Sequence, residues 1–321
     1  MMLRARRGFR GVIIGLLGVM WLSGCAGVLG QDRPGAASAG ASSKDIGALL
    51  AQADSALDAE RFDVAQENFL EVLRADPRNA RARLGAGETL LRAGQSQQAV
   101  TVFTALLRDK AIANDKLIRA RAAEGLGRAY LKIGRPDQAV IQLRDAVAAD
   151  PSLWQAWNGL GFYHSGRAEW PAAEDSYDRA LQAKPGNAVV ESNLGNALLT
   201  QRKFVSAEAH LRRAVEIDPH LAVAQGNLRL AQAWQGKYAE ALAGVKDKEL
   251  TLALNNVGVV AMRRGDYEAA EQFLVRAMES SPTYEVDAAE NLEKLRVLKA
   301  GGAAASGSTA AAGVAPASVA P

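Results

Sequence analysis

The side chains that could carry out catalysis or bind a metal ion are few and scattered in this sequence of 321 residues. Of the three histidines, His164, His210 and His220, no two are four residues apart on one helical face, the spacing that metal binding favours. Gly125-Leu126-Gly127 and Gly159-Leu160-Gly161 look like fragments of a dinucleotide-binding fingerprint, but both lack its third glycine and a preceding strand. The serines and carboxylates form neither a nucleophile elbow nor a catalytic pair. The sequence therefore predicts a protein that is not an enzyme, with no cofactor, no metal site and no small-molecule substrate.

The single cysteine, Cys25, is the one residue at which the sequence does predict chemistry. It follows a head with four arginines and no acid, an apolar run over residues 11–22, and the small residues Ser23 and Gly24. A basic head, a short apolar body and a small-residue end are typical of a secretory signal peptide, here predicted over 1–24. Because no second cysteine is present, an intramolecular disulfide is excluded.

The stretch Leu22-Ser23-Gly24-Cys25 resembles the lipobox of bacterial lipoproteins at every position. The resemblance implies cleavage before Cys25, diacylglycerol on its thiol and acylation of the new amino group, and several acyl chains on one residue anchor a protein stably. Ala26 rather than aspartate follows the cysteine, so the lipoprotein sorting rule implies the outer membrane of a Gram-negative cell, facing the periplasm. The alternatives are an ordinary signal peptide or an uncleaved anchor with an incidental cysteine.

Composition excludes two further classes of protein. With 49% hydrophobic and 23% charged residues, the chain can bury a substantial core, which argues against full disorder. The formal net charge of +3 comes from the four arginines of the head. Without them, 38 − 4 = 34 basic residues remain against 35 acidic ones. The sequence therefore predicts no nucleic-acid partner.

One pattern of proline, alanine and glycine recurs over residues 46–284. Pro151, Pro185 and Pro219 are 34 residues apart. If such prolines are taken as position 32 of a repeat unit, the units begin at residues 46, 80, 120, 154, 188, 222 and 251. Position 20 is then alanine in every unit, position 8 is glycine in five, and position 24 is large and apolar. The position-20 residues are Ala65, Ala99, Ala139, Ala173, Ala207, Ala241 and Ala270, and the glycines are Gly87, Gly127, Gly161, Gly195 and Gly258. The position-24 residues are Phe69, Phe103, Leu143, Tyr177, Leu211, Val245 and Leu274.

This pattern resembles the 34-residue signature of the tetratricopeptide repeat (TPR) family. The resemblance implies an all-α fold, a right-handed solenoid of about seven helix-turn-helix units with a C-terminal capping helix. Small residues at positions 8 and 20 let the two helices of a unit approach closely, and the residue at position 24 fills the space between them. Four units have glycine at position 15, where a helix end favours a left-handed residue. The sequence thus predicts a lipidated cysteine and flexible tether over 25–45, the array over 46–284, the cap over 285–300 and a disordered Ala/Gly/Ser/Pro tail over 301–321.

The TPR resemblance places positions 2, 5, 6, 9, 12 and 13 of each first helix on the concave face. Units two and three contribute five bases and two acids there, Glu88 and Glu124, whereas units four to seven contribute mainly asparagines. Because an asparagine side chain both donates and accepts hydrogen bonds, a row of them fits the backbone of an extended peptide. The plainer alternative is that a concave position only needs a polar residue. The candidate groove residues are Asn158, Asn193, Asn196, Asn227, Asn255, Asn256, Arg263, Arg81, Arg92, Arg121, Arg128 and Lys132.

A lipid-anchored solenoid without chemistry of its own is a binding scaffold. Its plan of lipobox, short tether and about seven repeats, and the stretch over 254–271, resemble the lipoproteins of the tight-adherence (Flp) pilus. The resemblance implies a role in assembly or outer-membrane localisation of the pilus secretion complex, with an outer-membrane secretin or another pilus component as protein partner. The alternatives are a scaffold for exopolysaccharide export or cell-envelope enzymes, and a type IV pilus pilotin. The basic positions of the groove favour an acidic segment or a chain terminus, unless they are ordinary solvated charges.

Overall fold

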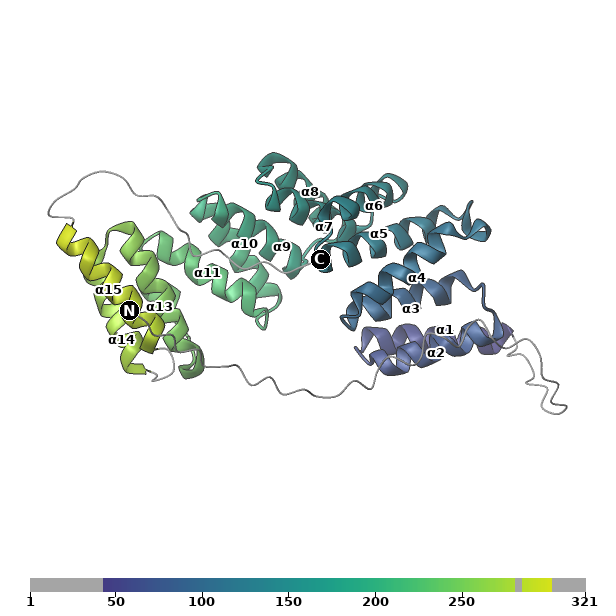
Figure 1. The fold of residues 1–321 in the computed structure, drawn as a ribbon, viewed down its shortest axis with the longest axis horizontal. Helices are drawn as coiled ribbons and strands as arrows, with labels where there is room; N and C mark the ends of the chain where they lie inside the picture. Colours follow the sequence, from purple (N-terminus) through teal and green to yellow (C-terminus); the bar gives the residue numbers. More distant parts are fainter. Residues whose placement is uncertain (1–42, 281–284, 302–321) are drawn as a thin grey trace, which may run out of the picture. The chain divides into compact units, whose positions relative to one another are not determined.

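A computed structural model describes residues 43–280 and 285–301 of the chain (Figure 1). All of the described helices belong to one compact unit. The predicted signal peptide, Cys25, most of the predicted tether and the tail from residue 302 lie outside the described residues.

Helices follow one another in pairs along the described chain. The first three pairs are α1 (Ser43–Asp58) with α2 (Phe62–Ala75), α3 (Ala80–Arg92) with α4 (Ser96–Arg108), and α5 (Lys116–Lys132) with α6 (Pro136–Ala149). The next three are α7 (Trp154–Gly166) with α8 (Trp170–Ala183), α9 (Ala188–Thr200) with α10 (Phe204–Ile217), and α11 (Ala222–Trp234) with α12 (Tyr238–Leu242). The last pair is α13 (Asp247–Arg264) with α14 (Tyr267–Ser280), and α15 (Glu285–Gly301) follows it. The prediction of an all-α, solenoid-like fold of about seven helix pairs with a C-terminal helix is confirmed, and no described residue lies in a strand.

Close approach of the two helices in a unit depends on three repeat positions. The position-20 alanines are completely buried in all seven units. In five units, a Cβ atom added at the position-8 glycine would lie 2.5–2.8 Å from the side chain at position 24 of the same unit, as in the pair Gly195 and Leu211. The side chain at position 24 therefore occupies the volume that a larger residue at position 8 would need.

The turn between the two helices of each unit requires a left-handed residue at position 15. Glycine fills that position in four units, and its φ lies between +72° and +89°. In the other three units Glu60, Ala168 and Arg202 adopt φ values of 57°, 56° and 63°. Because a side chain is strained in this region, the packing of the repeat, rather than residue preference, imposes the turn there.

Two junctions depart from the 34-residue pattern. The extra residues of unit two form a short 3-10 helix, η1 (Lys110–Ile112), and the first turn of α5. The shortened unit six has a second helix of only 5 residues, so Val245, at position 24, lies beyond its end. The following helix α13 has 18 residues and packs on α11 as well as on α12.

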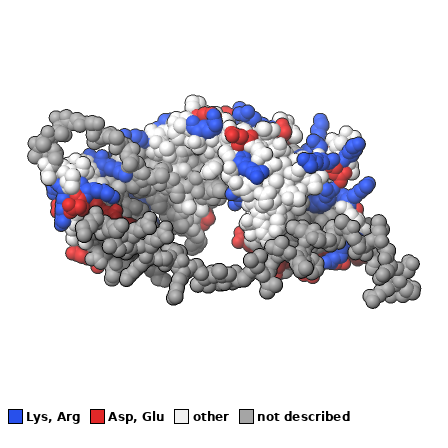
Figure 2. Space-filling model, viewed as in Figure 1, with Lys and Arg blue, Asp and Glu red and all other residues white. Residues whose placement is uncertain are grey.

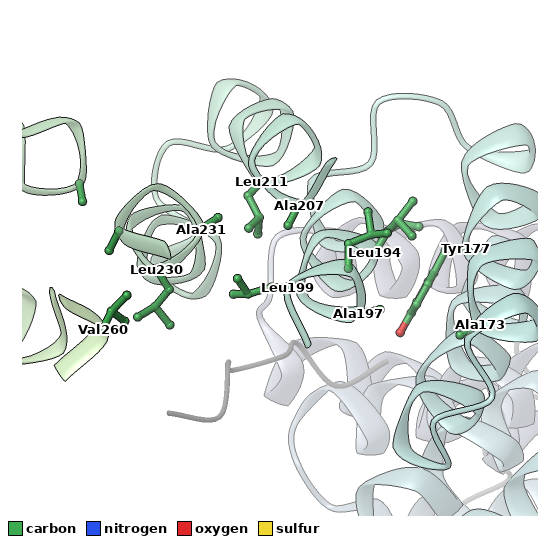
Figure 3. Close-up of a cluster of buried hydrophobic side chains, with 14 of the residues drawn as sticks. Ala173, Tyr177, Leu194, Ala197, Leu199, Ala207, Leu211, Leu230, Ala231 and Val260 are labelled. Atoms are coloured by element: carbon green, nitrogen blue, oxygen red, sulfur yellow. The ribbon is translucent and has the colours of Figure 1, made fainter. Parts of the chain in front are cut away.

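One apolar cluster runs continuously from α8 to α13. Figure 3 shows labelled side chains of one cluster, from Tyr177 of α8 through Leu194, Leu211 and Leu230 to Val260 of α13. The first helices of successive units, called here the inner helices, also pack on one another, as α3 does on α5 and α5 on α7. Within residues 43–280 and 285–301, no helix has the length and apolar character that crossing a bilayer requires.

Candidate functional site

Three of the five predicted groove bases in units two and three form ion pairs with residues of the preceding unit. Arg81 on α3 pairs with Asp54 on α1, and Arg92 lies 3.6 Å from Glu60. Arg128 on α5 donates from Nη1 to both carboxylate oxygens of Glu88 on α3, at 3.2 and 3.1 Å.

Arg121 and Lys132 are exposed and form no ion pair with the described residues. The expected attraction for an acidic partner therefore rests mainly on these two side chains. In the view of Figure 2, basic and acidic side chains are interspersed.

The asparagine row lies deeper than a freely solvated groove surface. Asn158, Asn193 and Asn227 are only 1%, 1% and 2% exposed. The Nδ2 atom of Asn193 on α9 donates to Oδ1 of Asn158 on α7 at 3.1 Å, so this contact links two successive units. Asn255 is half-buried and accepts a hydrogen bond from Asn291 of α15 at 3.0 Å. Part of the row thus holds inner helices together, and its role as a peptide clamp stays a hypothesis.

Of the remaining candidates, Asn196 and Asn256 are half-buried and Arg263 is exposed. The Trp234 ring stacks on the Phe204 ring at a centroid distance of 5.2 Å. The histidines do not come together: His164 contacts Glu169 at 2.6 Å and His210 contacts Glu191 at 2.7 Å. Among the described residues, no three His, Cys, Asp or Glu side chains are arranged to hold a metal ion.

Buried polar atoms without a hydrogen-bond partner concentrate on the inner face. Among the described residues six such side-chain atoms occur, and four of them lie at positions 5 and 9 of units three and five. They are Glu124 Oε1 and Arg128 Nε on α5, and Ser192 Oγ and Asn196 Oδ1 on α9. An unsatisfied buried polar group costs about 1–3 kcal/mol, and all four atoms are shielded from solvent, with Ser192 itself 0% exposed.

Glu124 is electrostatically unusual within this face. Burial raises the pKa of its carboxyl group from 4.5 to about 7, and the nearby Glu88 carboxylate adds to the rise while Arg128 opposes it. The cause is visible in the pairing: the guanidinium of Arg128 is bound by Glu88, which leaves Glu124 without a hydrogen-bonded cation. Repeat position 5 is enough to place Glu124, and Ser192 two units later, on the concave face. Their burial and the lack of hydrogen-bond partners for their buried atoms depend on residues of other units, so repeat position alone does not reveal them.

The paired helices, the small residues between them and a polar inner face define a helical-repeat protein of the class that binds other proteins. Residues 50–116, 124–188 and 166–222 match one tetratricopeptide repeat profile, and residues 250–281 match a second. Because these matches span more than half of the sequence, the chain belongs to the tetratricopeptide repeat family. Proteins of this family mediate protein–protein interaction.

Comparison with individual proteins gives one curated relative and several solved structures. Over 86 residues the chain is 34% identical to the type IV pilus assembly protein PilF of Pseudomonas aeruginosa, which is 27% of this chain and 34% of PilF. The chain thus spans about a third of the length of that relative. The crystal structure of the APC/C hetero-tetramer Cut9-Hcn1 is similar with a TM-score of 0.55 and 15% identity, covering 78% of this chain and 52% of that one. The C-terminal part of a TPR protein from Cytophaga hutchinsonii gives 0.51 and 17%, covering 74% and 97%. At these identities the structures show a shared fold alone.

Proposed function

We propose that this chain is a non-catalytic, lipid-anchored scaffold that binds an extended segment of a protein partner along its inner helices. The observation that carries the proposal is the set of four unpartnered polar atoms on α5 and α9. The set contains the donor Arg128 Nε, the acceptors Glu124 Oε1 and Asn196 Oδ1, and the Ser192 hydroxyl, which can do both. An extended peptide offers N–H and C=O groups in alternation. Its backbone can pair with both kinds of atom once a local rearrangement of the inner face exposes them, because each of the four atoms is shielded from solvent.

The pathway we propose is pilus assembly at the outer membrane. Three features support it: the lipobox ending at Cys25, the 34% identity to part of PilF, and the resemblance of the last repeat to the tight-adherence pilus lipoprotein TadD. In this proposal Cys25 carries the lipid, the array faces the periplasm, and the partner is an outer-membrane secretin or another component of a Flp (type IVb) secretion complex. The match to PilF gives specific support to a second candidate, a pilotin of a type IV pilus.

Binding through the groove can be tested without removing any internal hydrogen bond of the described structure. In the double variant S192A/N196A, two unsatisfied atoms are lost, so we expect a free energy of unfolding equal to or above that of the parent. We expect the same variant to lose most of the partner recovered by in-cell crosslinking of the lipidated protein with mass spectrometry. The control is Ser176→Ala, whose buried hydroxyl donates to the Ala172 carbonyl on α8, away from the inner face. Undiminished capture by the double variant would exclude these positions from the binding surface.

The pathway is tested by what is captured and by deletion of the gene. Recovery of a secretin, with loss of secretin multimers and surface pili in the deletion strain, supports pilus assembly. Loss of the strain's polysaccharide matrix with intact pili, or capture of cell-wall machinery alone, would refute it. Metabolic labelling with a fatty-acid analogue tests the lipid, and Cys25→Ala should abolish the label.

A further inference from the structure

The charged side chains that meet between α3 and α5 do not balance, and of these Glu88 is 27% exposed. Glu88 and Glu124 are two carboxylates, and Arg128 is the one guanidinium that binds either of them in the described structure. Glu124 is 7% exposed and the Arg128 side chain is 11% exposed, so water neutralises this imbalance poorly. When Glu124 is ionised, the cluster contains one buried negative charge without a partner.

The surrounding charged groups leave this imbalance in place. Arg121, one turn before Glu124 on α5, is exposed, so solvent screens its charge. Asp150, at the end of α6, contributes a further negative charge and is held by hydrogen bonds from the Ser152 hydroxyl and backbone amide. On α7, which packs on α5, the residues at groove positions 2 and 5 are the neutral Gln155 and Asn158.

We propose that Glu124 and Glu88 form a subsite of the groove for a cationic group, supplied by a lysine or arginine side chain of the bound segment. The cation pairs with the Glu124 carboxylate, whose shielded Oε1 atom a local rearrangement must expose, and it supplies the positive charge that the cluster lacks. An acidic side chain at this point would meet two carboxylates, so the subsite selects against the acidic segment that the basic positions suggested. This inference rests on the proposed function, because it presumes that a protein segment occupies the groove.

Such a subsite couples binding to the protonation of Glu124. In the empty groove the pKa of Glu124 is about 7, and a bound cation favours the ionised carboxylate, so binding releases a proton when the pH is below about 7. The affinity for a cationic segment should therefore be about tenfold higher at pH 8 than at pH 6. An equivalent neutral segment should show no such change.

The test uses random dodecapeptides displayed with a blocked amino terminus and selected at pH 8 on the purified full chain in detergent. We expect the selected sequences to contain lysine or arginine at one shared position, and this enrichment to disappear on Glu124→Gln. A synthetic acetylated peptide from the selection should lose about tenfold affinity on Glu124→Gln or on replacement of its own lysine by norleucine. The peptide with a free amino terminus and no lysine tests whether the terminal ammonium group serves equally. Glu216→Gln, an exposed change on α10, is the control.

A second variant keeps the test decisive if Glu124→Gln does not fold. Glu88→Gln frees Arg128 to pair with Glu124, so it should also abolish the cation preference. Selected peptides without enrichment of basic residues, or with enrichment of acidic ones, overturn the subsite but leave the groove. Failure to select any peptide on the parent chain overturns the proposed function together with the subsite.

Discussion

An ion pair between successive units recurs in the array and gives the sharpest stability prediction. Its strongest example involves Glu208 of α10. This side chain is 8% exposed and accepts hydrogen bonds from Lys237 at 2.7 Å, Gln235 at 2.8 Å and Arg212 at 2.6 Å. Burial by itself would raise the pKa of Glu208, but the hydrogen bonds from Lys237, Gln235 and Arg212 outweigh it and lower the pKa from 4.5 to about 2. The ionised carboxylate is therefore favoured by folding.

The size of the effect follows from this pKa difference. Lowering the pKa from 4.5 to about 2 corresponds to about 3 kcal/mol, and because Lys237 and Arg212 are 40% and 51% exposed, screening reduces our expectation to about 2 kcal/mol. Folded Glu208 binds a proton more weakly than unfolded Glu208, so its contribution is fully present above pH 4.5 and is lost as the pH falls towards 2. Glu208→Gln should thus lower the free energy of unfolding by about 2 kcal/mol at neutral pH.

The assay is urea unfolding of the purified chain followed by far-UV circular dichroism, repeated at pH values between neutral and about 2. Glu174→Gln is a matched control, since Glu174 occupies the same repeat position one unit earlier and accepts from Lys203 and Gln201, both at 2.8 Å. Glu174 is 32% exposed, so its replacement should cost no more than about 1 kcal/mol. Equal effects of the two variants, or a difference between parent and Glu208→Gln that persists unchanged at the lowest pH, would refute the reasoning.

Two further stability predictions use the same unfolding assay. Gly195→Ala places a Cβ atom 2.6 Å from Cγ of Leu211 and should cost about 1–3 kcal/mol, whereas Gly226→Ala, with nothing within 4 Å, should stabilise α11 by about 0.5–1 kcal/mol; equal effects would contradict the proposed close approach. Ala168→Gly should relieve the strain at φ 56° and stabilise the chain by up to about 1 kcal/mol, while Ala105→Gly, on an exposed face of α4, should destabilise it by a similar amount. Destabilisation by both alanine-to-glycine changes would show that the turn carries no strain.

Much of the fold is predictable because each unit repeats the same local packing. The contact of Gly195 with Leu211 follows from positions 8 and 24 of the repeat, and the buried Ala207 follows from position 20. The helix ends at Ala168 and Arg202 were harder to predict, since neither residue prefers the left-handed conformation that packing imposes. At Val245 the position count was misleading, because the missing residues shorten α12 to 5 residues and the chain leaves the helix before that position.

The candidate site is less accessible to sequence reasoning because its properties arise between units. Repeat positions suffice to place Glu124 and Asn193 on the inner face. That Asn193 binds Asn158, or that Glu88 binds Arg128 and so leaves Glu124 without a cation, depends on side chains 35 and 40 residues apart in sequence. Repeat periodicity predicts which face of a helix a residue lies on. It does not predict which neighbouring side chain that residue pairs with. The same limit explains why the basic groove positions of units two and three suggested an acidic ligand, although three of those five charges are bound internally.

The distribution of satisfied and unsatisfied polar groups separates the stabilising surfaces of this chain from its candidate binding surface. At position 21 of units four and five, Glu174 and Glu208 accept hydrogen bonds from side chains of the following unit. At positions 5 and 9 of the inner helices, Glu124 and Ser192 keep buried polar atoms without partners, at a cost of about 1–3 kcal/mol each. Apolar residues of similar size would remove this cost, so stability alone does not account for the polar atoms. In the proposed function a bound segment forms the missing hydrogen bonds, which is consistent with the placement of four of the six such atoms at positions 5 and 9 of the inner helices.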